Sequence, residues 1–223
     1  MPAYFSPALF AFLRALKAHN DREWFQANRD RYVEDVEAPT LRFIRDLAPH
    51  LSAMSPAFVD DPKRTGGSMY RIYRDTRFSA DKSPYKTHVA ASFPHKERKT
   101  APSVPGFYLH LEPGDCMGGG GIYHPDMPTL TRIRLSIASD GKAWGEVKRT
   151  GLEIQGDSLT RAPTGFDPSH RFIDDLRRKD LYAMVSFSQR EVCAADFLDR
   201  YVESCRTVMP LVSFLTRALG WRW

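Results

Sequence analysis

The chain has 223 residues, 42% of them hydrophobic and 26% charged, and its 32 Lys and Arg against 27 Asp and Glu give a net charge of +5. This length can bury a sizeable core, and no uncharged run approaches the roughly 18 apolar residues of a membrane helix, so we expect no membrane partner. Three cysteines, Cys116, Cys193 and Cys205, lack C-x-x-C spacing, which argues against a disulfide framework and a cysteine zinc site. Residues 1–13 lack the basic region and cleavage site of a signal peptide, so we expect a cytoplasmic protein.

The N-terminal part of the chain has the pattern of helices. Ser6 followed by Pro7 is a favourable helix start, and Asn20 with Glu23 three residues later resembles a capping box that opens a second helix. Apolar residues continue at helical spacing to about residue 53, and a loop rich in Pro, Asp and Gly follows. The sequence therefore predicts N-terminal helices over about 6–53.

The middle of the chain changes to strand-like segments. Residues 68–73, 86–93 and 106–112 are short, rich in aromatic or β-branched residues and bounded by Pro and Gly, which favours strands. The glycine run 118–121 indicates a bulge or a place where another group approaches the backbone closely. We therefore expect the central strands within about 68–123.

The last part mixes helices and strands. Helical patterns run from 128 to 151, a possible edge strand covers 152–159, a charged helix covers 171–179 and a strand covers 181–187. Ser188 then opens the C-terminal helices at 189–219, which we expect to bend or split at Pro210.

These elements predict an α+β fold with a central, mostly antiparallel sheet flanked by N-terminal and C-terminal helices. The sequence has no internal repeat and no linker-like segment, so we expect one domain over residues 1–223. Its parts are helices at about 6–53, strands at about 68–123, mixed helix and strand at 128–187, and helices at 189–219.

The positive charge of the chain is concentrated in one segment. Residues 66–100 hold eight Lys and Arg against three Asp and Glu, which leaves 24 of each elsewhere. Within its run from 71 to 86, only Asp75 and Asp81 oppose five cations, so at least some cations need a partner from outside the run. We call these five the cationic run: Arg71, Arg74, Arg77, Lys82 and Lys86.

Three interpretations of the cationic run are open. The first is a site on the central sheet where the five cations bind a small molecule that carries phosphate or carboxylate, with Asp75, Tyr85 and His110 orienting it or moving protons if a reaction occurs. The second is a non-catalytic module that docks on an acidic protein surface or on nucleic acid; the clustering of the basic residues in one segment makes nucleic acid the less favoured partner. The third is a structural brace, in which acids pair with every cation. We also expect Arg74 and Asp75 to form a buried or half-buried pair that orders the turn before Pro84, because Asp75 is the acid nearest in sequence to two arginines.

Histidines are the next candidates for chemistry, ahead of the serine and cysteine nucleophiles, which lack a G-x-S-x-G motif or an evident basic partner. His88, His110, His124 and Asp126 are the possible metal ligands, and alternation along the strands places His88 with Ala90 and His110 with Glu112. No H-x-H or H-E-x-x-H spacing holds two ligands together. We therefore expect no metal ligands, no cofactor and no metal requirement for folding.

Several motifs resemble one known family. They are the segment 20–25 (Asn-Asp-Arg-Glu-Trp-Phe), the run from Arg71 to Lys86, the segment 106–110 (Gly-Phe-Tyr-Leu-His) and the segment 119–123 (Gly-Gly-Gly-Ile-Tyr), with 159–167 and 175–179 in support. In their order along nearly the whole chain, they resemble the bacterial family called domain of unknown function 2461. The resemblance implies a single-domain protein, and it carries over no reaction, cofactor or catalytic residue.

Overall fold

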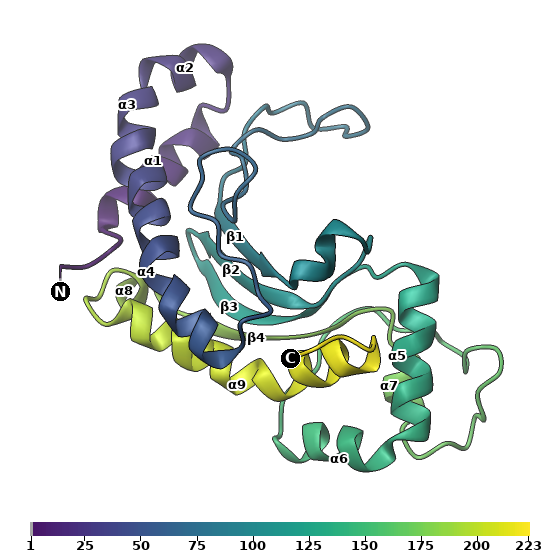
Figure 1. Ribbon diagram of the computed structural model, residues 1–223. Helices are drawn as coiled ribbons and strands as arrows, with labels where there is room; N and C mark the ends of the chain where they lie inside the picture. Colours follow the sequence, from purple (N-terminus) through teal and green to yellow (C-terminus); the bar gives the residue numbers. More distant parts are fainter. Residues whose placement is uncertain (1) are drawn as a thin grey trace.

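The computed structural model describes residues 2–223, and helices from both ends of the chain pack on one face of a central sheet (Figure 1). The N-terminal helices are α1 (Pro7–Ala18), α2 (Arg22–Ala27), α3 (Arg29–Tyr32) and α4 (Ala38–Met54), with a π-helical turn at Val33–Glu37 before α4. Ser6 caps α1 as predicted, because its hydroxyl accepts a hydrogen bond from the Ala8 amide. The predicted cap of α2 is wrong by one residue: Asp21 accepts from the Trp24 amide, and Asn20 instead bonds the Tyr85 backbone.

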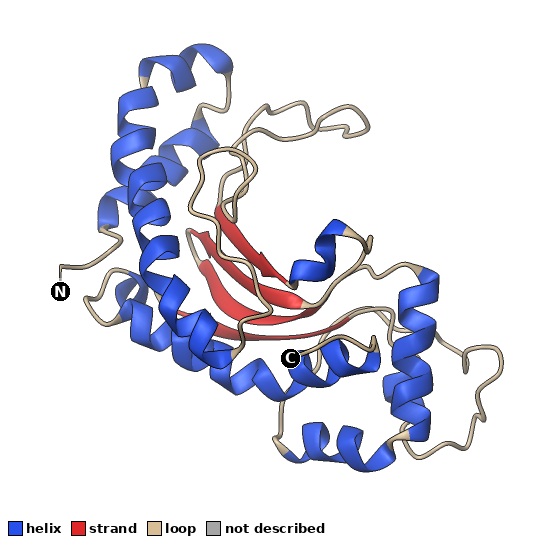
Figure 2. Ribbon diagram, viewed as in Figure 1, coloured by secondary structure: helices blue, strands red, loops and turns tan. Residues whose placement is uncertain are grey.

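The sheet has four antiparallel strands in the order β1-β2-β3-β4 (Figure 2). They are β1 (Val89–Pro94), β2 (Gly106–Glu112), β3 (Asp115–Ile122) and β4 (Leu181–Phe187). The strand predictions at 106–112 and 181–187 are confirmed. The α+β fold with an antiparallel sheet between N-terminal and C-terminal helices is therefore correct.

Two predicted strands are absent from the described structure. Residues 68–73 run along the edge of β1 and pair only through isolated bridges, Met69 with Ala91 and Tyr73 with Tyr85. Residues 152–159 lie beside β4 in the same way, with bridges Gln155–Tyr182 and Ser158–Arg178. Both segments have the composition of strands, but they contact the sheet at too few backbone positions to form a ladder.

The glycine run is part of β3, and it allows close approach on two sides. A Cβ atom at Gly119 would lie 2.1 Å from the Ala183 carbonyl oxygen of β4, and one at Gly118 would lie 2.7 Å from the ring of Tyr201. The expectation of close approach is confirmed. Glycine therefore lets β4 and the C-terminal helix pack against β3.

The remaining helices follow β1 in the chain. They are the short 3₁₀ helix η2 (Lys96–Lys99), α5 (Met127–Ser139), α6 (Gly141–Arg149), α7 (Ile173–Leu176), α8 (Gln189–Val192) and α9 (Phe197–Ala218). The predicted charged helix at 171–179 is only the short α7. α9 continues through Pro210 without a break. Within residues 2–223, no helix combines the length and apolarity needed to cross a membrane.

The two faces of the sheet have different surroundings. On β2, Phe107, Leu109 and Leu111 are buried against the helical layer, whereas Tyr108 and His110 lie on the opposite face and are partly exposed. In Figure 1, α4 and α9 cover the first face, and a hairpin formed by residues 73–85, closed by the bridge between Tyr73 and Tyr85, projects beyond the β1 edge. The open face is where a ligand can reach the sheet.

Candidate functional site

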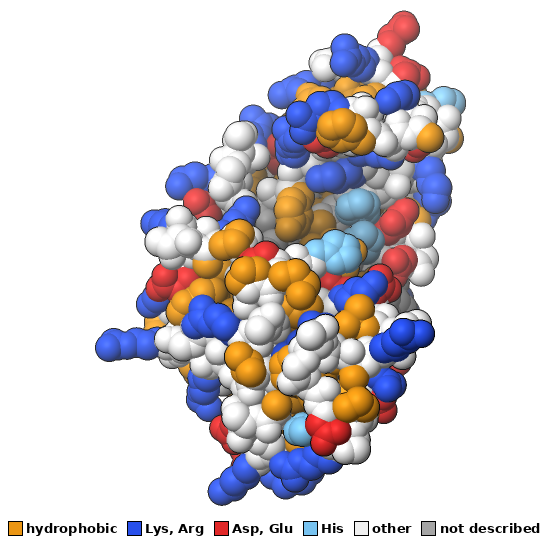
Figure 3. Space-filling view, turned by 90° about the vertical axis from the view of Figure 1, so that its right-hand side faces the viewer, with side chains coloured by type: hydrophobic (Ala, Val, Ile, Leu, Met, Phe, Trp, Pro, Cys, Tyr) orange, Lys and Arg blue, Asp and Glu red, His pale blue; other side chains and the backbone are white. Residues whose placement is uncertain are grey.

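A groove of about 630 Å³ crosses the open face of the sheet. Its floor follows the strand register, in which Tyr108 of β2 lies opposite Gly119 of β3, which lies opposite Met184 of β4. In Figure 3, histidine and hydrophobic side chains gather in the hollow of this face. The polar and aromatic side chains that line the groove include Tyr70, Lys86, His88, Tyr108, Tyr123 and Tyr182.

Lys86 is the cation of the groove. Its side chain is partly buried, with Nζ donating to the Arg71 carbonyl oxygen at 2.9 Å and lying 5.3 Å from the centre of the Tyr70 ring. Burial, and then the nearby positive charge of Arg71, lower the pKa of the Lys86 ammonium. Within residues 2–223, neither Lys86 nor Arg71 forms an ion pair with a carboxylate; Asp75, whose carboxylate interacts electrostatically with Arg71, pairs with Arg77, so Lys86 has no acidic partner of its own.

The other three cations of the run, Arg74, Arg77 and Lys82, have their partners within the hairpin. Arg74 pairs with Asp81, and the Arg77 guanidinium donates two hydrogen bonds to the Asp75 carboxylate, at 2.7 and 3.0 Å. Lys82 donates to the Thr76 carbonyl oxygen at 3.0 Å. Of the five predicted ligand contacts, the structure thus places Lys86 in the groove and Arg71 beside it, and places Arg74, Arg77 and Lys82 in the hairpin.

The expected pair of Arg74 with Asp75 is wrong. Asp75 is exposed and holds Arg77, and this contact keeps the pKa of the Asp75 carboxyl below its ordinary value. Arg74 turns instead to Asp81 across the hairpin. The reason is local geometry, because side chains of consecutive residues in an extended backbone point to opposite sides.

The three candidates for proton transfer have different surroundings and do not form one site. Asp75 is in the exposed hairpin, and Tyr85 is buried, with its ring stacked on Phe25 at a centroid distance of 4.1 Å. Burial raises the pKa of the Tyr85 phenol. His110 alone lies on the groove face of the sheet, next to Tyr108.

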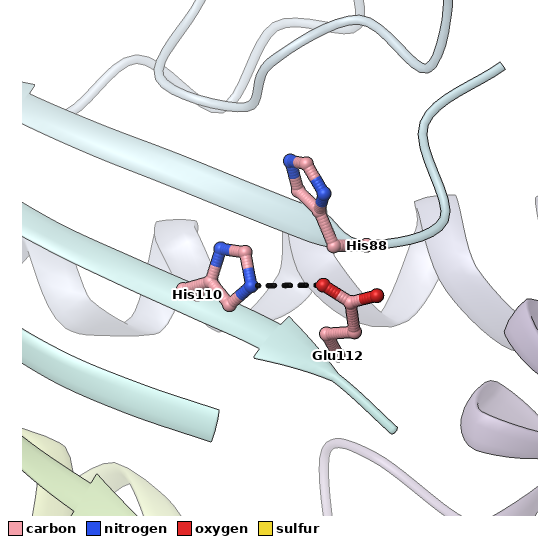
Figure 4. A group of neighbouring side chains, drawn as sticks. All are labelled: His88, His110 and Glu112. Atoms are coloured by element: carbon pink, nitrogen blue, oxygen red, sulfur yellow. Dashed lines mark ion pairs between the residues drawn. The ribbon is translucent and has the colours of Figure 1, made fainter. Parts of the chain in front are cut away.

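His88, His110 and Glu112 form a compact cluster at one end of the groove (Figure 4). The register pairs Val89 with Leu111, so one further step places His88 opposite Glu112, and His110 shares their face. One ligand atom from each of the three lies within 4.8 Å of the others. His110 Nε2 and Glu112 Oε2 lie 3.5 Å apart, and the centres of the His88 and His110 rings lie 4.6 Å apart.

The cluster has a defined electrostatic state. Burial, followed by the adjacent His110, lowers the pKa of His88 to about 4, so its imidazole is neutral at neutral pH. The Tyr108 hydroxyl and His110 Nδ1 form a hydrogen bond of 3.2 Å, and burial raises the pKa of that hydroxyl to about 12. The cluster therefore combines the neutral imidazole of His88 with a second imidazole and a carboxyl group, which are residue types suited to binding a metal ion.

Comparison with known proteins identifies the family. The family described as "Conserved hypothetical protein (DUF2461)" matches residues 8–214. The chain belongs to this family. The resemblance seen in the sequence motifs is thereby confirmed. In this member of DUF2461, those motifs lie in the hairpin, in β2 and in the glycine-rich β3. No curated protein and no solved structure matches the chain.

Sequence reasoning found both histidines of the cluster but grouped them with the wrong partners. The His124 ring lies 2.9 Å from Asp180, and Asp126 caps α5 through the Thr129 amide, so neither belongs to the cluster. Glu112 is the residue that was missed. The signal was the spacing His110-x-Glu112 on one strand face, but the third member becomes visible only with the register of β1 against β2.

Proposed function

We propose that this protein binds a small molecule with a phosphate or carboxylate group in the groove on the open face of its sheet. Lys86 and Arg71 receive the anionic group, and the aromatic side chains of the groove contact the rest of the ligand. We further infer that it acts in the bacterial cytoplasm, because its three cysteines are free, as in a reducing compartment.

The uncompensated charge of Lys86 carries this proposal. A lysine that is partly buried and beside a second cation has a lowered pKa, which means that its charged form is disfavoured where it stands. An anion that enters the groove lowers this electrostatic cost and accepts hydrogen bonds from the ammonium group. Arg74 and Arg77 already pair with acids, so they gain less from a ligand, and Lys82, which donates to a backbone carbonyl as Lys86 does, is exposed and lies outside the groove.

The shape and lining of the groove support a small ligand over a macromolecule. A volume of about 630 Å³ is in the range of small-molecule sites. Tyr70, Tyr108 and Tyr182 offer ring faces and hydroxyl groups inside it. A module that docks on nucleic acid or on an acidic protein surface is favoured instead by a flat basic face, and here most hairpin cations are engaged with acids.

The test compares two groups of cations with the same ligands. Chelator-treated protein is melted with phenyl phosphate, benzoate or inorganic phosphate, and with neutral benzyl alcohol, at constant ionic strength. A ligand that binds only the folded state at a hundredfold excess over its Kd adds about 2.7 kcal/mol of stability. The variants are Lys86→Met, which removes the groove cation, and Arg77→Ala/Lys82→Ala, which removes two hairpin cations.

We expect phenyl phosphate or benzoate to raise the melting temperature of the wild type and of the hairpin variant, and to lose this effect in Lys86→Met. Benzyl alcohol is the control for the apolar part, and inorganic phosphate reveals the general stabilisation by excluded salts. An effect lost only in the hairpin variant would place the ligand there and refute the groove. An equal effect in all three proteins would refute specific anion binding.

A further inference from the structure

The strand pairing brings three metal-binding side chains to one point. His110 and Glu112 are two residues apart on β2, so both point to the open face, and His88 precedes β1 directly opposite Glu112. We propose that His88, His110 and Glu112 together bind a divalent transition-metal ion at the end of the groove. This inference goes beyond the proposed binding of an anion and does not depend on it.

The contact between His110 and Glu112 has the spacing of two ligands on one metal. A separation of 3.5 Å between Nε2 and Oε2 is too long for a normal hydrogen bond, and Nε2 is buried without a hydrogen-bond partner. Two ligand atoms at about 2.0–2.1 Å from a tetrahedral zinc ion lie about 3.4 Å apart. A metal ion would therefore satisfy the buried nitrogen with little movement of either side chain.

The other contacts of the cluster involve His110 Nδ1 and Glu112 Oε1, which leaves Nε2 and Oε2 available to a metal ion. The Tyr108 hydroxyl lies 3.2 Å from His110 Nδ1; in the tautomer that carries its proton on Nδ1, this nitrogen donates to the hydroxyl oxygen and the Nε2 lone pair is available to the ion. On the carboxylate, Thr87 Oγ1 donates to Oε1 at 3.3 Å and Lys17 Nζ lies 3.9 Å from the same oxygen. Oε2, which faces His110, has neither contact.

His88 completes the set and connects it to the groove. It lies within the 4.8 Å limit of the cluster, is partly exposed and lines the groove, so rotation about its side-chain torsions can bring a ring nitrogen closer to the other two ligands. Two imidazoles and one carboxylate suit zinc, iron(II), cobalt(II) or manganese(II). Three protein ligands leave at least one coordination position for water or a substrate atom.

The test measures metal binding directly, without any groove ligand. Full-length protein is treated with chelator, dialysed and titrated with Zn²⁺ by calorimetry, and with Co²⁺ by visible absorption, which reports the coordination geometry. Parallel titrations use Mn²⁺ and, without oxygen, Fe²⁺. The ligand variants are His110→Ala and Glu112→Gln. The matched control is His19→Ala, which removes an exposed histidine at the end of α1.

We expect one equivalent of at least one of these ions to bind wild type and His19→Ala with equal affinity, and to bind His110→Ala and Glu112→Gln at least about 100-fold more weakly. Tyr108→Phe should weaken binding by about 10–100-fold, as loss of a contact that orients a metal ligand does. Circular dichroism of each metal-free variant verifies that it is folded. If His110→Ala does not fold, Glu112→Gln, which keeps the size of the side chain, still tests the proposal. Absence of saturable binding of all four ions to wild type, or equal binding to Glu112→Gln, would overturn the proposal.

Discussion

Replacing Gly118 by alanine tests how β3 is held against the C-terminal helix. Gly118 is on the covered face of the sheet, and an added Cβ would lie 2.7 Å from the ring of Tyr201 and 3.0 Å from the Ser204 hydroxyl. Both residues belong to α9, and the Tyr201 ring is fully buried. Since ordinary contacts between carbon atoms are about 3.5–4.0 Å, the ring or the strand must move by about 1 Å.

The expected cost follows from two opposing effects. Adding a methyl group to a well-packed core costs about 1–3 kcal/mol. Alanine also restricts the unfolded chain more than glycine does, which returns about 0.4–1 kcal/mol. For a packing cost in the middle of that range, about 2 kcal/mol, the net loss in the free energy of unfolding is about 1–1.6 kcal/mol, or a decrease of about 2–6 °C in melting temperature for a chain of this size.

Gly145→Ala is the matched control, because it makes the same chemical change in a different environment. Gly145 is inside α6, and a Cβ there meets nothing closer than 4.0 Å. Alanine should stabilise that helix by about 0.5–1 kcal/mol. Thermal and guanidinium unfolding of both variants, followed by circular dichroism, measure the opposite signs. A Gly118→Ala protein as stable as wild type would refute the packing argument for β3.

Two further predictions concern buried groups away from the groove. The Asp175 carboxylate accepts hydrogen bonds from the Trp144 indole at 2.9 Å and from Lys148 at 3.0 Å. In a denaturant titration, Asp175→Ala should therefore cost about 3 kcal/mol of unfolding free energy. Asp175→Asn should lose less because it keeps an acceptor, and equal losses in the two variants would contradict this reasoning. Burial raises the pKa of Cys116 to about 11 and that of Cys205 to about 12, whereas Cys193 is only partly buried. At a pH of about 8, a thiol reagent should therefore label Cys193 first and the other two only after denaturation. Rapid labelling of all three in the folded protein would show that the buried thiols are accessible.

Much of the fold was predictable because local signals decided it. The Ser6 cap fixed the start of α1, and the bounds of β2 and β4 followed from residue composition and the Pro and Gly residues beside them. Segment 68–73 has an equally good strand composition, yet it makes only bridges to its neighbours. Whether such a segment becomes a strand depends on how much of an adjacent strand edge it can reach, and that is a property of the tertiary structure.

The candidate site was predictable in part for a related reason. The excess of cations in one segment was visible in the sequence, and Lys86 among them lines the groove. Which arginine binds which acid depends on the turn: Asp75 holds Arg77 two residues later, and Asp81 reaches back to Arg74. Counting charges therefore located the region but could not identify which cations pair with acids and which one lines the groove.

The register of one strand pair places both proposed sites. Alternation puts Lys86 and His88 on the groove face, whereas Val89, Ala91 and Phe93 are buried on the opposite face. A shift of one residue in the pairing of β1 with β2 would turn these apolar side chains toward water, so the core strongly resists it. The same shift would remove His88 from its position opposite Glu112. The hydrophobic residues of β1, which have no chemistry of their own, thus determine whether the metal ligands meet and whether the groove has its cation.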